Sequence, residues 1–343
     1  MKIRRPWLLP LAPVYGAVLA LKERMFRWGW LNQNRLQNTV ISVGSVSAGG
    51  AGKTPVVLML TEMLRHRGYA VRILTRGYGR RGAVTVERVE AFDDPRWLGD
   101  ESVLLAQRSG APVFVGAERY RAGLLAEQSE PTEKRVVHLL DDGFQHRQLA
   151  RDVDIVLLTK EDVEDKLLPA GNLREQVATI EKADVVVLRE EEVESLGRFV
   201  DALTREKSGP AIWVIRRTLS LGEGGEVALP TMPVAFCGIA RPESFARMLK
   251  GNGYEPTDMV VFADHHSYGE RDVVRLLERA RLCGANGFVT TEKDAVKLTR
   301  EMRERLETIG PIVVARLNVE LVEEQEAMMQ LVAMVGGLDR RRR

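Results

Sequence analysis

The fold is decided by one stretch of the sequence, the run Thr39-Val-Ile-Ser-Val43 followed by Gly44-Ser-Val-Ser-Ala-Gly-Gly-Ala-Gly-Lys-Thr-Pro55. The first five residues are typical of a buried β-strand, and a helical pattern, Val56–Arg67, follows the glycine-rich segment. Glycines allow successive backbone N–H groups to face phosphate oxygens, and a helix N-terminus adds partial positive charge. The stretch therefore predicts a phosphate-binding loop between a strand and a helix.

Two side chains at the end of this loop have the chemistry that a nucleotide requires. Lys53 has the length to reach the β- and γ-phosphates, and the Thr54 hydroxyl is suited to Mg²⁺. The usual pattern has glycine at position 47, where this chain has serine, so an ordinary strand-to-helix turn is the alternative interpretation. The predicted nucleotide-binding residues are Ser47, Ala48, Gly49, Gly50, Ala51, Gly52, Lys53 and Thr54.

Short apolar runs alternate with longer helical patterns along the rest of the chain, which predicts an α/β fold with a parallel sheet. The first series of strands is expected at Thr39–Val43, Ala70–Leu74, Pro112–Val115, Val136–Leu140, Asp154–Leu158 and Asp184–Leu188. A second series is expected at Pro233–Cys237, Val260–Ala263, Gly287–Thr290 and Pro311–Ala315. Between the two series, Ile212–Leu219 and Val227–Leu229 flank a Gly-rich turn and predict a β-hairpin.

These patterns predict a P-loop NTPase-type domain and a second, smaller α/β domain joined by a β-hairpin linker. The expected parts are an apolar membrane-associating segment (1–31), the P-loop domain (32–211), the linker (212–232) and the smaller domain (233–343). A length of 343 residues suits two domains. The net charge of +2 gives no strong attraction to nucleic acid, so no nucleic-acid partner is expected.

The first thirty residues combine an uncharged stretch, Pro6–Leu21, with a following cluster of Lys, Arg and Trp side chains. The stretch is shorter than the roughly 20 apolar residues that span a bilayer, and prolines interrupt it. Basic and aromatic residues beside an apolar helix favour a segment lying in the membrane interface. A true span and a helix buried on the protein remain the alternatives.

Paired carboxylates end one of the predicted strands, in the run Val136-Val-His-Leu-Leu-Asp-Asp142. A P-loop fold needs an acidic residue on a neighbouring strand to hold the metal or its water. Asp141 and Asp142 are therefore candidate metal residues together with Thr54, and the spacing does not decide which of the two acids contacts the metal.

The ordered set of motifs resembles one family, the tetraacyldisaccharide 4′-kinases of lipid A biosynthesis. The altered phosphate loop is followed by Asp141-Asp-Gly-Phe-Gln-His146, and further matches occur in the same order along the whole chain. They are Arg76-Gly-Tyr-Gly79, Gly99-Asp-Glu101, Pro169-Ala-Gly-Asn-Leu-Arg-Glu175, Phe262-Ala-Asp-His265 and Thr291-Glu-Lys-Asp-Ala-Val-Lys297.

The resemblance implies transfer of the ATP γ-phosphate to the 4′-hydroxyl of an acylated glucosamine disaccharide 1-phosphate, giving lipid IVA. It also implies Mg²⁺ and work at the cytoplasmic face of an inner membrane, with the enzyme peripheral or anchored by its N-terminus. By resemblance, Asp100 is the candidate general base and His265 the partner that orients it. Thr291 is expected to cap a helix with Asp294 in a structural role.

The substrate phosphate and the transferred group both require positive charge near the site. Arg174 is the first candidate, and Gln145 and His146 follow the acidic pair closely enough to meet the sugar or the nucleotide. The remaining candidates for substrate binding are Arg76 and Arg119. A P-loop kinase of another lipid-linked sugar and a membrane-bound nucleotide switch are the alternative functions.

Overall fold

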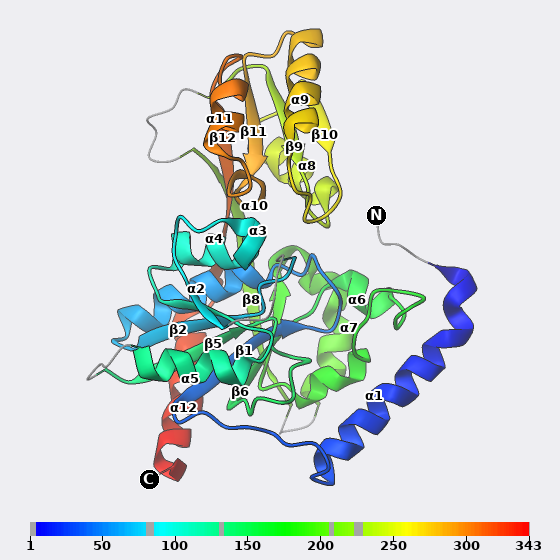
Figure 1. Cartoon of the computed structure of the whole chain (residues 1–343). Coiled ribbons are helices and arrows are strands. Elements are labelled where there is room, and N and C mark those ends of the chain that lie inside the picture. Colours follow the sequence, from blue (N-terminus) through cyan, green and yellow to red (C-terminus); the bar gives the residue numbers. More distant parts are fainter. Residues whose placement is uncertain (1–4, 80–85, 130–133, 206–208, 223–228, 343) are drawn as a thin grey trace.

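The structure is a computed structural model that describes residues 5–79, 86–129, 134–205, 209–222 and 229–342 (Figure 1). Within these residues one mostly parallel twelve-stranded sheet forms, with the order β10-β9-β11-β12-β8-β7-β6-β1-β5-β2-β4-β3. Only the pairs β12–β8 and β3–β4 are antiparallel among the described strands. The strands are β1 (Thr39–Ser45), β2 (Ala70–Thr75), β3 (Glu87–Val89), β4 (Val113–Val115), β5 (Val136–Asp141), β6 (Val153–Leu157), β7 (Val185–Arg189), β8 (Ala211–Leu221), β9 (Pro233–Cys237), β10 (Asp258–Val261), β11 (Gly287–Thr291) and β12 (Ile312–Leu321).

Helices cover both faces of the sheet, and this explains why the central strands have no polar alternation. Every residue of β1, β7 and β9 is buried. The α-helices are α1 (Ala12–Arg27), α2 (Lys53–His66), α3 (Pro95–Leu98), α4 (Asp100–Ser109), α5 (Arg119–Ser129), α6 (Lys160–Glu164), α7 (Val193–Thr204), α8 (Pro242–Gly251), α9 (Glu270–Leu282), α10 (Glu292–Ala295), α11 (Arg300–Leu306) and α12 (Glu324–Arg342). Short 3₁₀ helices are η1 (Pro6–Leu11), η2 (Val177–Lys182) and η3 (Glu190–Glu192).

Two groups of elements are visible in Figure 1. We call β1–β7 with α2–α7 and α12 the large lobe, and β9–β11 with α8–α11 the small lobe. The buried apolar residues follow this division. Two core clusters contain only residues between Leu219 and Ala315, and they are separate from the cluster around the central strands of the large lobe. The strands β8 and β12 run from one lobe to the other.

Most predicted strands are confirmed to within two residues. The strand predicted at Pro311–Ala315 continues to Leu321, as β12, and the antiparallel edge strand β3 was missed. The linker needs a correction, because the antiparallel partner of β8 is β12, in a register from Leu221 opposite Ala315 to Ile215 opposite Leu321. Residues 223–228 of the predicted hairpin lie outside the described residues. The domain boundaries themselves stay a prediction.

The position of α12 also differs from the expected one. The helix follows the small-lobe elements in sequence and was assigned to the smaller domain. Its buried residues Met328, Leu331 and Val335 belong instead to the same core cluster as Val43 of β1. The chain thus returns to the large lobe through β12, and α12 completes the core beneath the phosphate loop.

This packing predicts a difference between two neighbouring positions of α12. Leu331→Ala removes a fully buried side chain and is expected to lower the free energy of unfolding by about 2–5 kcal/mol. Met329→Ala, on the exposed side of the same helix, is expected to change it by less than about 0.5 kcal/mol. Denaturant unfolding measures both, and equal effects would contradict the placement of α12 in the core.

Candidate active site

The glycine-rich loop between β1 and α2 has the backbone shape that phosphate binding requires. Gly49, Gly50 and Gly52 have φ values of 75°, 70° and 93°, a region that favours glycine. Lys53 is the first residue of α2, so the helix N-terminus points into the loop. Ser47 does not adopt a positive φ, which explains why this position needs no glycine.

The carbonyl groups of the loop are occupied by two guanidinium groups from distant segments. Arg174 Nη2 donates to the Ser47 carbonyl at 3.0 Å. Arg189 Nη2, at the end of β7, donates to the carbonyls of Gly50 and Ala51 at 3.1 and 3.0 Å. Because these carbonyls already have partners, the loop keeps its N–H groups for an anion. Arg189 was not predicted, and its sequence neighbourhood gives no signal of this role.

Lys53 and Arg174 converge on Asp142. Arg174 donates to both carboxylate oxygens of Asp142 at 2.8 and 2.7 Å, and Lys53 Nζ lies 3.4 Å from Oδ1. Burial alone would raise the pKa of Asp142, but the charges of Lys53 and Arg174 outweigh it and hold the pKa well below its usual range. Asp142 is therefore a fixed anion that orients the two cations.

Asp141 has the opposite environment although it is the adjacent residue. Its side chain is buried at the end of β5, and Oδ2 accepts a hydrogen bond from Thr75 Oγ1 at 3.3 Å. Burial, Glu101 and Asp142 together raise the pKa of Asp141 to about 7. Oδ1 has no hydrogen-bond partner among the described residues. A buried carboxylate oxygen without a partner beside the phosphate loop fits a cation ligand.

A metal site made only of protein groups is not present in the part of the chain that the structure describes, because no three His, Cys, Asp or Glu side chains converge on one point there. A Mg²⁺ ion usually keeps several waters and substrate phosphates as ligands, and the protein supplies one or two groups. The surroundings of Asp141 suit this arrangement, with Thr54 at the start of α2.

Asp100 and His265 are brought together from the two lobes. His265 Nδ1 lies 3.2 and 3.0 Å from the carboxylate oxygens of Asp100, which begins α4. The hydrogen bond to Asp100 raises the pKa of His265. Burial would raise the pKa of Asp100, but His265, Lys293 and Lys297 lower it overall. The pair predicted from the sequence is thus a charged pair at the junction of the lobes.

Two lysines near this pair were missed as site residues. Lys293 forms an ion pair with Glu101 of the other lobe, and Lys297 lies 3.9 Å from Asp100 and 2.8 Å from Asp294. The predicted cap is confirmed, because the Thr291 side chain accepts a hydrogen bond from the backbone N–H of Asp294. The sequence signalled only this local cap, since Lys293 meets a partner 192 positions away.

A cavity of about 200 Å³ lies between the lobes, directly over the phosphate loop. One wall consists of loop residues and the start of α2, and the other comes from the small lobe and includes Arg241, Asp264 and His265. Its apolar lining suits a flat base, and includes Leu58, Leu104, Leu219, Ile239, Phe245 and Met248.

The remaining substrate candidates lie on the side of the loop that faces α1. Gln145 Nε2 donates to the Ser45 carbonyl at 2.9 Å, which ties it to the loop. Burial lowers the pKa of His146 to about 4, and the nearby charges of Arg119, Arg151, Lys22 and Arg76 act in the same direction. Arg119 is buried and donates to the Ala117 carbonyl, whereas Arg76 is exposed. The structure therefore gathers these predicted residues into one positively charged region.

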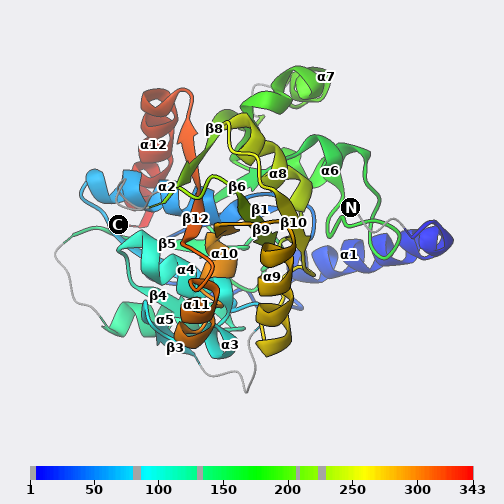
Figure 2. The ribbon, with the colours of Figure 1, turned by 90° about the horizontal axis from the view of Figure 1, so that it is seen from above.

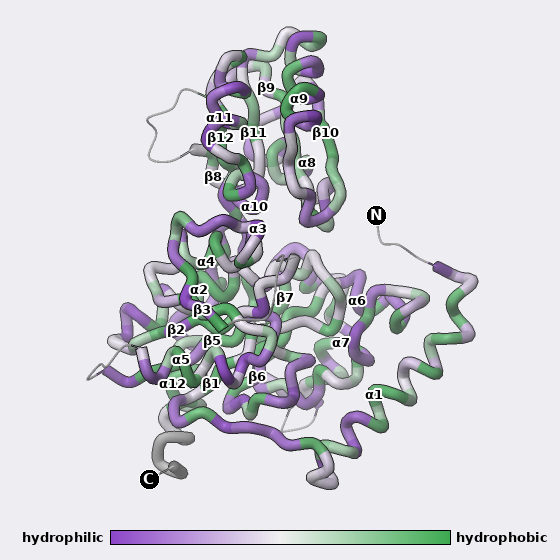
Figure 3. Tube along the Cα trace, in the orientation of Figure 1, coloured by the Kyte–Doolittle hydropathy of each residue, from purple (hydrophilic) through white to green (hydrophobic). Residues whose placement is uncertain are grey.

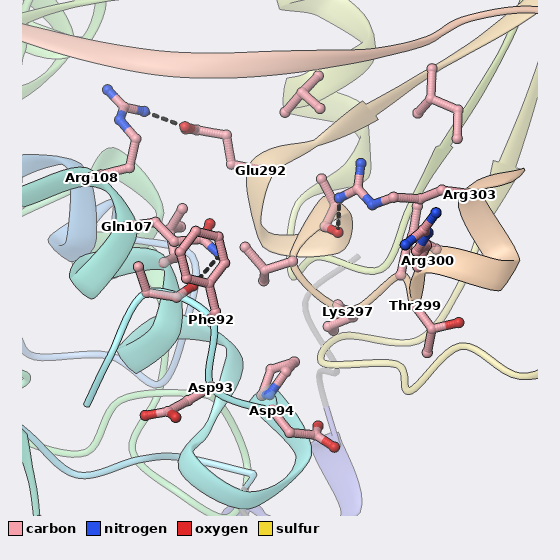
Figure 4. Close-up of a pocket in the computed structure, with 18 of the residues that line it drawn as sticks. Phe92, Asp93, Asp94, Gln107, Arg108, Glu292, Lys297, Thr299, Arg300 and Arg303 are labelled. Carbon is pink, nitrogen blue, oxygen red and sulfur yellow. Dashed lines mark hydrogen bonds and ion pairs between the residues drawn. The ribbon is translucent and has the colours of Figure 1, made fainter. Parts of the chain in front are cut away.

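A larger cavity, of about 810 Å³, lies at another part of the lobe junction (Figure 4). It contains many charged side chains but no residue of the phosphate loop. Arg108 is held there by Glu292, and Arg303 by the Ala295 carbonyl. The Arg108–Glu292 ion pair joins α4 of the large lobe to α10 of the small lobe, so this cavity marks a contact between lobes.

The loop and its acidic neighbours define a class of protein, the P-loop nucleotide-binding proteins with an α/β fold. Within that class, the model of the LpxK family, described as tetraacyldisaccharide-1-P 4′-kinase, matches residues 4–335. The chain belongs to this family.

Individual relatives agree with the match. The tetraacyldisaccharide 4′-kinase of Koribacter versatilis is 36% identical over 333 residues, which cover 95% of this chain and 98% of the relative. That of Syntrophotalea carbinolica is 38% identical over 305 residues, or 85% and 83% of the two chains. The crystal structure of the "apo" form of LpxK from Aquifex aeolicus in complex with ATP is similar with a TM-score of 0.73 and 28% identity, over 96% of this chain and 98% of that one.

The contacts of Arg189 predict a defect in nucleotide binding. Arg189→Met leaves the carbonyls of Gly50 and Ala51 without their charged donor. Loss of hydrogen bonds to a charged group costs about 1.5–3 kcal/mol, so the variant is expected to bind ATP roughly 10- to 150-fold more weakly. Arg198→Met, at an exposed position of α7, serves as the control and is expected to bind ATP like the wild type. Titration calorimetry with ATP measures both, and equal affinities would show that the loop keeps its shape without Arg189.

Proposed function

We propose how this family member carries out its tetraacyldisaccharide 4′-kinase activity in lipid A biosynthesis, with ATP as the donor and the 4′-hydroxyl of tetraacyldisaccharide 1-phosphate as the acceptor. The observation that carries the proposal is the cavity over the phosphate loop, which has the Asp100–His265 pair at its edge. Phosphate groups and a candidate base are thereby within reach of one acceptor hydroxyl.

In the proposed reaction the oxygen of the 4′-hydroxyl forms a bond to the γ-phosphorus of ATP. The bond from that phosphorus to the β–γ bridging oxygen breaks, and its electron pair leaves with ADP. Asp100 takes the proton of the hydroxyl, and His265 holds the carboxylate in place through Nδ1. The products are ADP and lipid IVA.

The phosphates of ATP are held by the loop N–H groups and Lys53, with Asp142 and Arg174 fixing the position of the lysine. Thr54 and Asp141 are the residues suited to Mg²⁺, which would neutralise charge on the β- and γ-phosphates when bound. Asp142 is less suited to the metal, since both of its oxygens already meet cations.

The acceptor is proposed to lie on the α1 side of the phosphate loop. Its own phosphate and sugar would meet the positively charged region of Arg76, Arg119 and His146, with Gln145 and Arg174 nearer the loop. A substrate that carries a phosphate before the reaction requires such cations, since an isolated buried anion is costly.

The lobes are proposed to act as two domains, residues 32–211 with α12 as the kinase domain and the small lobe as the closing domain. Their link would be β8 and β12, which are shared by both. Closure over ATP would exclude water from the γ-phosphate, which suits a transferase better than a hydrolase.

The membrane surface is the second proposed partner, at the cytoplasmic face of the inner membrane. None of the side chains of α1 is buried, and its exposed apolar residues Val14, Val18 and Leu21 repeat at helical spacing. Figure 3 shows apolar residues along the length of α1. Exposed Trp7 precedes the helix, and Trp28 and Trp30 pack on each other after it. Within the described residues, no helix combines the length and apolarity needed to cross a membrane.

The function is tested with purified protein in detergent, labelled ATP, Mg²⁺ and tetraacyldisaccharide 1-phosphate. Label is expected to move to the lipid. Transfer only to another lipid-linked sugar would favour the alternative kinase. Hydrolysis without transfer to any acceptor would favour the nucleotide switch and reject the proposal.

The Asp100–His265 pair predicts a characteristic pH dependence. Asp100→Asn is expected to lower kcat by about 10²–10⁴-fold with little change in the KM for ATP. The base must be ionised, so the rate falls when the pH drops through the pKa of Asp100. His265→Ala removes the largest favourable influence on the carboxylate, which raises its pKa and moves this acidic limb to higher pH.

Rate profiles of kcat/KM against pH measure the shift. His66→Ala, at an exposed position of α2, is the matched control and should leave the profile unchanged. An acidic limb that stays in place in the His265 variant would remove the histidine from this role.

The membrane proposal predicts the effect of charges on α1. The double variant Val18→Asp, Leu21→Asp is expected to reduce binding to phosphatidylglycerol vesicles at least tenfold, because two carboxylates would have to enter the interface. Leu282→Asp, at an exposed apolar position of α9, is the control and should bind normally. Vesicle sedimentation measures both, and undiminished binding of the double variant would mean that another surface docks the protein.

A further inference from the structure

The small lobe places one guanidinium group against the phosphate loop. The segment after β9 reaches Arg241, which directly precedes α8. A Cβ atom added to Gly50 would lie 2.8 Å from Nε of Arg241 and 3.2 Å from its Cγ and Cδ atoms. The absence of a side chain at Gly50 therefore allows Arg241 to approach the loop backbone, and the approach is made at the part of the loop that faces the cavity.

The surroundings of Arg241 indicate a ligand-binding role. Its side chain is only 15% exposed and lines the cavity together with Lys53 and Thr54. Nη1 lies 2.9 Å from Oε2 of Glu161 in α6 of the large lobe, but it makes no hydrogen bond of ordinary geometry within the described residues. Figure 2, seen from above, shows α8 on the same side of the molecule as α6, and Figure 1 places the two helices at different heights. The guanidinium is thus held near the loop by charge, with donor capacity left for another acceptor.

The other cations around the phosphate loop already have assigned contacts. Lys53 and Arg174 meet Asp142, Arg189 meets the loop carbonyls, and Lys293 meets Glu101. Arg217, which also lines the cavity, is paired with Glu191. Nη1 of Arg241 has no well-aligned hydrogen-bond partner within the described residues, and its side chain packs over Gly50, so Arg241 is the cation best suited to a phosphate.

We propose that Arg241 is the phosphate-contacting residue that the small lobe supplies, donating to oxygens of the β- and γ-phosphates while the phosphoryl group moves. This inference rests on the proposed kinase reaction. Negative charge grows on the oxygen that leaves with ADP as its bond to the γ-phosphorus breaks, and a planar guanidinium with several donors is suited to that charge. Glu161 holds the guanidinium when no phosphate is present.

The arrangement gives closure of the lobes a chemical consequence. Arg241 belongs to the small lobe and the phosphate loop to the large lobe, so the positive charge reaches the phosphates only when the lobes are together. Arginines supplied in this way are worth about 10³–10⁵-fold in rate in other P-loop proteins.

The test compares three variants of the full chain in detergent with ATP, Mg²⁺ and tetraacyldisaccharide 1-phosphate. Arg241→Met is expected to lower kcat at least about 100-fold, with a change of less than about fivefold in the KM for ATP. Arg241→Lys keeps the charge but not the fork of donors and is expected to be intermediate. Glu164→Gln, at an exposed position of α6, is the matched control and is expected to stay within about threefold of the wild type.

A binding measurement separates this inference from the proposed function and from misfolding. Each protein is titrated with ADP and with ADP plus aluminium fluoride, which mimics the moving phosphoryl group. Arg241→Met is expected to reduce the preference for the fluoride complex at least about tenfold, whereas misfolding would reduce both affinities equally.

The kinase proposal fails if the wild type transfers no phosphate to the lipid. In that case the ratio of the affinities for ADP with and without aluminium fluoride still tests the role of Arg241. An unchanged preference in Arg241→Met overturns the inference. A loss in Glu164→Gln as large as that in Arg241→Met also overturns it, because the effect would then not be specific to Arg241.

Discussion

The structure of the site depends on one constraint, that a loop binding phosphate through its N–H groups must satisfy its carbonyl groups elsewhere. Arg174 and Arg189 meet this requirement at Ser47, Gly50 and Ala51. Arg189 depends on the order of the sheet, since β6 pairs with β1 and β7 pairs with β6, and Arg174 is placed by the bridge between Ser47 and Leu173. The order of the strands thereby sets the conformation of the loop, and the loop sets where the phosphates lie.

Nearby charges give the two adjacent carboxylates different pKa values. Asp142 meets Lys53 and Arg174 and stays ionised, whereas Asp141 faces Glu101 and a buried strand end, which raise its pKa to about 7. Two neighbouring acids with pKa values moved in opposite directions have different tasks. One fixes the position of protein cations, and the other is a buried acceptor that requires a cation or a proton.

Local patterns were sufficient to predict the parts of the site that are contiguous in sequence. The strand, the glycines and the first residues of α2 form one segment, and Asp141–Asp142 ends a strand of clear apolar character. The contacts that complete the site are long-range. Arg189 donates to the carbonyl of Gly50, which lies 139 positions away in the sequence. β8 pairs with β12, and the elements of the small lobe lie between these two strands in the sequence. The local sequence does not distinguish an arginine that binds a buried carbonyl from an arginine on the surface. These contacts can therefore be identified only in the folded structure.

In the proposed mechanism, the candidate catalytic groups come from two lobes, so the lobe junction takes part in the chemistry. Asp100 meets His265, Glu101 meets Lys293, and each pair has one member in each lobe. A separated large lobe would keep the phosphate loop but lose the imidazole that holds Asp100, and it would leave Glu101 without its cation. Each lost partner raises the free energy of a charged group that is shielded from water. The charged pairs therefore favour the arrangement in which the lobes are in contact, which is the state in which the proposed phosphate transfer would exclude water.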